Sequence, residues 1–96
     1  MRPSEALQAH RAEIRRVVLA HRAINPRVFG SVARGDDRDD SDLDLLVDAL
    51  PGATLFDLGG LQDELESLLG VRIDLLTPSD LPPTLRAKTL AEAQAV

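Results

Sequence analysis

Cysteine, tryptophan and tyrosine are absent from this 96-residue chain, and phenylalanine occurs only twice. The absence of cysteine excludes disulfide bonds and every thiolate metal site. The two histidines, His10 and His21, are eleven residues apart, which argues against a zinc site. With Phe29 and Phe56 as the only aromatic residues, recognition of single-stranded nucleic acid by base stacking has little support. We therefore expect no direct binding of nucleic acid.

Long apolar runs are also missing. No segment approaches the roughly 18 consecutive apolar residues that a membrane-spanning helix needs, and the first residues lack the apolar segment of a signal peptide. We expect no membrane association and a cytoplasmic location. A hydrophobic share of 44% is adequate for one small core, so the length predicts a single domain over residues 1–96.

The net charge of −5 is unevenly distributed along the chain. Residues 1–34 contain seven arginines and two glutamates, whereas residues 35–96 contain four basic and fourteen acidic residues. Seven of the sixteen acidic residues lie between Asp36 and Asp48. Because such a cluster repels itself unless it is solvated or neutralised, it is the first indication of a cation site.

Hydrophobic periodicity predicts an alternation of helices and short strands. Ser4 is the expected N-cap of a first helix that ends at Asn25-Pro26. The following segments predict a strand at 27–29, a helical turn at 31–34, a strand at 43–47, a helix stopped by Gly70, a strand at 71–76 and a closing helix at 85–93. This order predicts an α/β or α+β domain with a small sheet.

A glycine and a serine stand where the first strand meets the helical turn. Gly30 allows a phosphate to approach the backbone, and the free N–H groups and positive dipole end of the turn attract it. The Ser31 hydroxyl adds a donor, and Arg34 lies on the same side of the turn with a guanidinium. Considered alone, this pattern more often marks a tight turn with a capping serine.

Two aspartates at alternate positions make a functional site more plausible. Asp42 and Asp44 project from one face of the predicted strand, and adjacent carboxylates repel unless a cation lies between them. A neighbouring strand places Asp74 within about 5 Å. Oxygen ligands without histidine or cysteine select Mg²⁺ or Mn²⁺, and three carboxylates can hold two such ions.

Two familiar cation and nucleotide motifs are excluded. An EF-hand loop that began at Asp40 would need glycine at position 45 and glutamate at position 51, where the chain has Leu45 and Pro51. A Walker A loop is excluded because Gly-Lys-Ser/Thr does not occur.

The segments Phe29–Gly35, Ser41–Leu45 and Val71–Leu76, with their spacing, resemble the minimal nucleotidyltransferase family of the DNA polymerase β-like superfamily. The resemblance implies a small mixed β-sheet flanked by helices, and Mg²⁺-dependent transfer of a nucleotide from a nucleoside triphosphate such as ATP. By position, Gly30, Ser31 and Arg34 bind the triphosphate. Asp42 and Asp44 are metal ligands, and Asp74 is a third ligand or the general base.

Family members of this size resemble antitoxins paired with a HEPN-domain ribonuclease toxin, which some of them silence by adding AMP. The alternative is a non-catalytic antitoxin that neutralises its toxin by complex formation. A third possibility, transfer to a small molecule such as an aminoglycoside, needs a second domain. The arginines of the first helix either meet an acidic partner or RNA, or form a solvated face that balances the acidic remainder.

Overall fold

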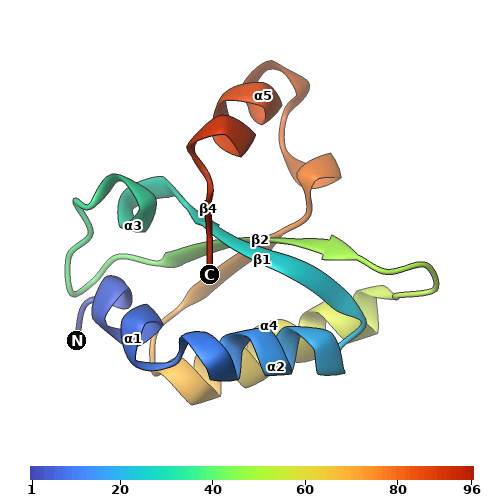
Figure 1. Ribbon diagram of the computed structural model, residues 1–96, viewed down its shortest axis with the longest axis horizontal. Coiled ribbons are helices and arrows are strands. Elements are labelled where there is room, and N and C mark those ends of the chain that lie inside the picture. Colours follow the sequence, from blue (N-terminus) through green and yellow to red (C-terminus); the bar gives the residue numbers. More distant parts are fainter.

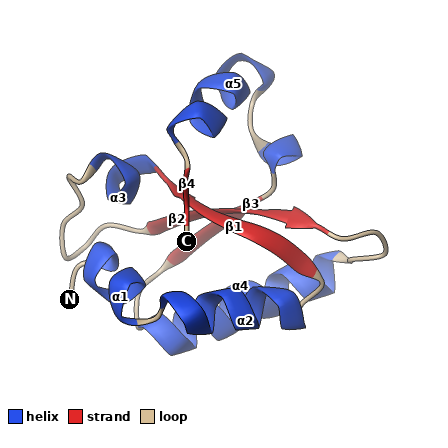
Figure 2. Ribbon diagram, viewed as in Figure 1, coloured by secondary structure: helices blue, strands red, loops and turns tan.

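A four-stranded mixed sheet organises the chain, and the computed structural model describes residues 1–96 (Figures 1 and 2). In chain order the elements are α1 (Pro3–Ala9), α2 (Arg11–Ala20), β1 (Ala23–Phe29), α3 (Gly30–Arg34), β2 (Leu43–Ala49), α4 (Leu55–Leu69), β3 (Ile73–Leu76), the 3-10 helix η1 (Pro78–Asp80), α5 (Pro83–Glu92) and β4 (Gln94–Ala95). The strand order is β3-β2-β1-β4. Strand β1 is antiparallel to β2 and β4, and β2 is parallel to β3. The predicted small mixed sheet flanked by helices is confirmed.

The hydrophobic core lies on one face of the sheet. Alternate residues of β2, namely Leu43, Leu45 and Val47, are fully buried there because successive strand side chains point to opposite faces. Helices α1, α2 and α4 cover this face (Figure 1) and contribute buried residues such as Ile14 and Leu61. None of the helices is both long and apolar enough to span a bilayer.

The opposite face of the sheet carries the acidic side chains of β2. Asp44 and Asp48 lie there and are only partly buried. Leu46 shares this face but is fully buried, because η1 packs against β2 and is followed directly by the buried Leu81. Helices α3 and α5 lie on this side of the sheet as well (Figure 2).

The N-terminal segment differs from the prediction of one helix capped by Ser4. The structure has two helices, α1 and α2, that are separated at His10, whose backbone is not helical. The N-cap is Arg2, whose N–H donates to Glu5 Oε1 at 3.2 Å. The Ser4 N–H instead donates to Asp37 Oδ2 at 2.9 Å. Asp37 is the only buried charged residue, and this long-range bond supplies its carboxylate with a donor.

Strand β1 also begins earlier than predicted. Asn25-Pro26 does not terminate a helix but forms a bulge inside the strand, where the pairing with β2 shifts between Ile24 and Arg27. Asn25 has a φ of 59°, and a bulge tolerates the missing N–H of proline.

The bounds of β3 and α5 shift by one or two residues from the predicted ranges. The two-residue strand β4 was not predicted, because so short a segment carries no periodicity.

Two glycines of the α4 region should respond oppositely to substitution by alanine. Gly59 lies inside α4, and an added Cβ there meets no atom within 4 Å. Gly70 ends α4 with a φ of 68°. We expect Gly59→Ala to stabilise the fold by about 0.5–1 kcal/mol and Gly70→Ala to destabilise it by about 1 kcal/mol. Urea unfolding followed by circular dichroism measures both, and a stabilising Gly70→Ala would contradict this account of the helix end.

Candidate active site

The turn between β1 and α3 lies directly against the acidic strand. Phe29 pairs with Asp44 across β1 and β2, so the next residue, Gly30, lies beside the Asp44 side chain. Gly30 has a φ of 69°, and a Cβ added to it would overlap with Asp44 Oδ2. Glycine is therefore required at this position for its backbone conformation and for the space that the carboxylate occupies.

Ser31 and Arg34 belong to the five-residue helix α3, which Gly30 begins. The first N–H groups of a helix have no partner within the helix. Ser31 is partly buried and Arg34 is exposed. The Arg34 Nε donates to Asp36 Oδ2 at 3.4 Å, and its charge also acts on Asp44. The structure thus gathers Gly30, Ser31 and Arg34 beside Asp44, as their sequence positions indicate.

Asp44 and Asp74 are direct neighbours in the parallel pairing of β2 and β3. Burial raises the pKa of Asp44 to about 6, and repulsion by Asp74 and Asp42 together with a hydrogen bond to Asp74 adds to this effect. The positive charge of Arg34 acts in the opposite direction. A half-buried carboxylate that is held beside a second one, with its pKa raised in this way, is a site that a cation stabilises.

Asp42 is placed differently from the other two aspartates. It directly precedes β2, and its Oδ1 lies 3.0 Å from Arg72 Nε. As the side chains stand, no three of the acidic and histidine groups are arranged to hold a metal ion. The structure therefore brings Asp44 and Asp74 together and pairs Asp42 with an arginine. All three groups are hard oxygen donors, which is the ligand type that Mg²⁺ and Mn²⁺ require.

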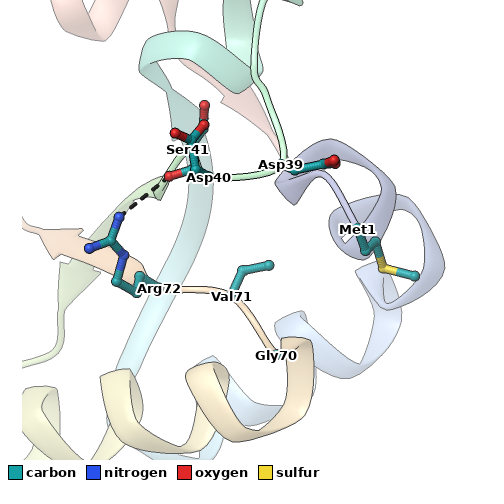
Figure 3. Close-up of a pocket in the computed structure, with 7 residues that line it drawn as sticks. All are labelled: Met1, Asp39, Asp40, Ser41, Gly70, Val71 and Arg72. Atoms are coloured by element: carbon teal, nitrogen blue, oxygen red, sulfur yellow. Dashed lines mark hydrogen bonds between the residues drawn. The ribbon is translucent and has the colours of Figure 1, made fainter.

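Arg72 is a residue of this site that the motif did not identify. The sequence contains a signal for it, because Arg72 and Asp74 stand at alternate positions of the strand predicted at 71–76, which places them on one face. An open pocket of about 290 Å³ borders this arginine, between the loop before β2 and the segment between α4 and β3 (Figure 3). Its lining residues are Met1, Asp39, Asp40, Ser41, Gly70, Val71 and Arg72. Asp44 and Asp74 lie outside this pocket.

The C-terminal strand supports the α3 turn. Gln94 Nε2 donates to the Ala33 carbonyl at 3.1 Å, which ties β4 to α3. Two arginines of α2 hold the same strand, since Arg11 Nη1 donates to the Ala95 carbonyl at 3.3 Å and Arg15 Nη1 to the Val96 carbonyl at 3.1 Å. Two of the arginines of the predicted basic first helix, which lie in α2, therefore have an intramolecular structural role. These contacts join residues more than 60 positions apart, and no local pattern indicates them.

Comparison with known proteins agrees with this geometry. The family model for the nucleotidyltransferase domain matches residues 11–96. The chain is 40% identical to the protein adenylyltransferase MntA of Thermococcus cleftensis over 86 residues, which are 90% of this chain and 84% of that protein. It is 39% identical to a Methanocaldococcus jannaschii protein that is named as a protein adenylyltransferase, over 80% of this chain and 83% of that protein.

Solved structures show the same fold. A structure described as a minimal nucleotidyltransferase superposes with a TM-score of 0.84 at 46% identity, and the match covers 97% of this chain and 93% of that one. A toxin–antitoxin crystal structure with AMP-PNP superposes with a TM-score of 0.73 at 20% identity, over 88% of this chain and 69% of that one. At this lower identity the match establishes the fold alone.

The two aspartates on the outer face of β2 should affect stability in opposite directions. The pKa of Asp44 is raised from 3.8 to about 6, so its favourable contribution is full below its ordinary pKa and is lost as the pH rises through the raised value. A hydrogen bond from Asn25, followed by one from Arg27, lowers the pKa of Asp48 despite its burial. Its contribution is therefore present above its ordinary pKa and is lost on acidification.

We therefore expect Asp44→Asn to raise the melting temperature at about pH 7.5 by several degrees, and to leave it nearly unchanged at about pH 4. Asp48→Asn, the matched control on the same strand, should lower it at about pH 7.5. Thermal unfolding in a chelating buffer measures both variants. A lower melting temperature for Asp44→Asn at neutral pH would show that the carboxylate is not destabilising.

Proposed function

Because this chain belongs to the nucleotidyltransferase domain family, we propose that it transfers AMP from ATP to a partner protein in a Mg²⁺-dependent reaction. The observation that carries this proposal is the contact between the Gly30 turn and the Asp44–Asp74 pair. The turn that we propose binds phosphate thus lies beside two carboxylates, whose oxygens are of the type that binds Mg²⁺. The names of the relatives from Thermococcus cleftensis and Methanocaldococcus jannaschii support protein as the acceptor.

The α3 turn binds the triphosphate in this proposal. The N–H groups of the first turn, which have no partner within the helix, donate to a phosphate oxygen. The Ser31 hydroxyl donates a further hydrogen bond. Arg34 is exposed at the end of the same turn, where its guanidinium can pair with a phosphate.

The aspartates divide between cation binding and proton transfer. Asp42 and Asp44 would hold Mg²⁺, and Asp74 would serve as a third ligand or as the general base. Bound Mg²⁺ supplies positive charge that neutralises the phosphate oxygens. Asp74 is exposed and lies on the edge strand β3, where an acceptor hydroxyl can reach it. That oxygen bonds to the α-phosphorus, the bond to pyrophosphate breaks, and the hydroxyl proton passes to the base.

We propose further that the acceptor is a HEPN-type toxin and that the chain acts as its antitoxin. The match to a toxin–antitoxin structure supports this proposal at the level of the fold. ATP and the RNA that such a ribonuclease cleaves are both found in the cytoplasm, so we propose the same location for this chain. The competing function is neutralisation by complex formation alone, in which the site residues have no catalytic role.

The first test separates ATP binding with Mg²⁺ from binding without it. Carboxylates that stand beside a triphosphate repel it unless a cation intervenes, so we expect ATP affinity to fall at least about tenfold without Mg²⁺. Mg²⁺ and ATP together should also raise the melting temperature by linkage. Calorimetric titration with and without the metal measures the difference, and equal affinities would exclude a metal-bridged site.

The second test separates catalysis from neutralisation by binding. Asp42→Asn combined with Asp44→Asn retains side-chain volume and removes two ligand charges, so transfer should fall by at least about 100-fold. Intact mass of the partner after incubation with ATP and Mg²⁺ reports the added AMP. Co-purification of the variant with the partner controls for complex formation. A variant that adds no AMP but still protects cells fully would support neutralisation by binding alone.

A further inference from the structure

Arg72 connects the start of β3 to the loop that carries Asp42. Its Nε lies 3.0 Å from Asp42 Oδ1, and its Nη2 donates to the Asp40 carbonyl at 3.4 Å. Figure 3 shows the guanidinium directed toward Asp40. The Arg72 carbonyl also accepts from the Leu43 N–H at 2.9 Å. Arg72 thus contacts both the backbone and a carboxylate of the loop between α3 and β2, residues 35–42, which we call the acidic loop.

The loop has few other cations near it. Its own arginine, Arg38, is exposed and forms no ion pair. Only the Arg38 backbone is hydrogen-bonded: its N–H donates to Ser41 Oγ at 2.9 Å, and its carbonyl accepts from the Ser41 N–H at 3.0 Å. Arg34 pairs with Asp36 at the other end of the loop. Arg72 is consequently the cation that neutralises Asp42.

We infer that Arg72 is an internal counter-ion that occupies Asp42 in the cation-free protein and leaves it when a divalent cation binds. The inference rests on the proposed function, because it concerns the same cation site. Both partners are accessible, with side-chain exposures of 76% for Arg72 and 47% for Asp42. Exposed ion pairs of this kind stabilise a fold only weakly. The adjoining pocket of about 290 Å³ gives the guanidinium room to turn away.

If Arg72 instead oriented Asp42 for metal binding, its removal would change the metal affinity in the opposite direction. An arginine that orients Asp42 as a ligand would be a positioning residue, and its removal would weaken metal binding. A counter-ion competes with the metal ion for the carboxylate and also repels the metal ion. Removal of the counter-ion therefore strengthens metal binding. The sign of the change in affinity therefore distinguishes the two roles without any measurement of catalysis.

The experiment titrates Mn²⁺ into the nucleotide-free protein at low salt and follows free Mn²⁺ by electron paramagnetic resonance. Arg72→Gln should bind Mn²⁺ about 2–5-fold more tightly than the unmodified chain, the range expected for release of an exposed ion pair. Arg38→Gln is the matched control, because it removes the same charge from the same region without touching Asp42. It should change the affinity by less than half as much. Arg72→Lys keeps a cation near Asp42 and should bind with nearly the original affinity.

Each other outcome has a defined meaning. Weaker binding by Arg72→Gln, or an increase no larger than that of Arg38→Gln, overturns the counter-ion role. The double variant Asp42→Asn with Asp44→Asn shows which part of the binding belongs to the site. If the unmodified chain binds Mn²⁺ no better than this double variant, the proposed metal site itself fails, and the inference fails with it. Melting temperatures in a chelating buffer verify that each variant is folded.

Discussion

Repulsion between neighbouring carboxylates is the interaction on which the rest of the candidate site depends. Parallel pairing of β2 and β3 aligns Asp44 with Asp74, and no hydrogen-bonded sheet can separate residues in register by more than a few ångströms. Burial first, and then this repulsion, raise the pKa of Asp44. A stable fold accepts such a cost where function requires it. The hydrophobic packing of β2 on its other face offsets this cost, because Leu43, Leu45 and Val47 are completely buried.

The same strand shows how a carboxylate is stabilised by hydrogen-bond donors. Asp48 is on the same face as Asp44, but it accepts hydrogen bonds from Asn25 at 3.0 Å and Arg27 at 2.9 Å. The bulge in β1 brings Asn25 into this position. Asp44 has instead a glycine backbone and a second carboxylate as neighbours. Four residues apart on one strand, the two aspartates therefore have opposite electrostatic environments, and their pKa values shift in opposite directions.

Several features of the site were predictable because they depend on local geometry. Alternation along a strand places the Asp44 side chain opposite the core, and the hydrophobic pattern identifies which face is the core. Gly30 and Ser31 follow a strand and open a helical turn, so the free backbone N–H groups of that turn are a property of four or five consecutive residues. Asp74 was predictable with one added assumption, that its strand lies beside β2, and the structure confirms that arrangement.

Other features depend on contacts between distant segments. The division of the first helix at His10 accompanies the Ser4–Asp37 hydrogen bond, and β4 forms only because β1 offers a free edge. Its attachment to α3 through Gln94 is equally non-local. No pattern in a short window encodes these contacts, since each depends on how the whole chain packs.

The sequence by itself determined the residue types of the site, the faces on which they project and the family to which the chain belongs, because these follow from side-chain chemistry and the two-residue period of a strand. Only the tertiary structure decided which charges are neutralised. Asp42 is paired with Arg72, thirty positions away along the chain, whereas Asp44 faces Asp74. The physical reason is that electrostatic energy depends on distances in space and on burial, and both are fixed only when β2, β3 and the acidic loop come together.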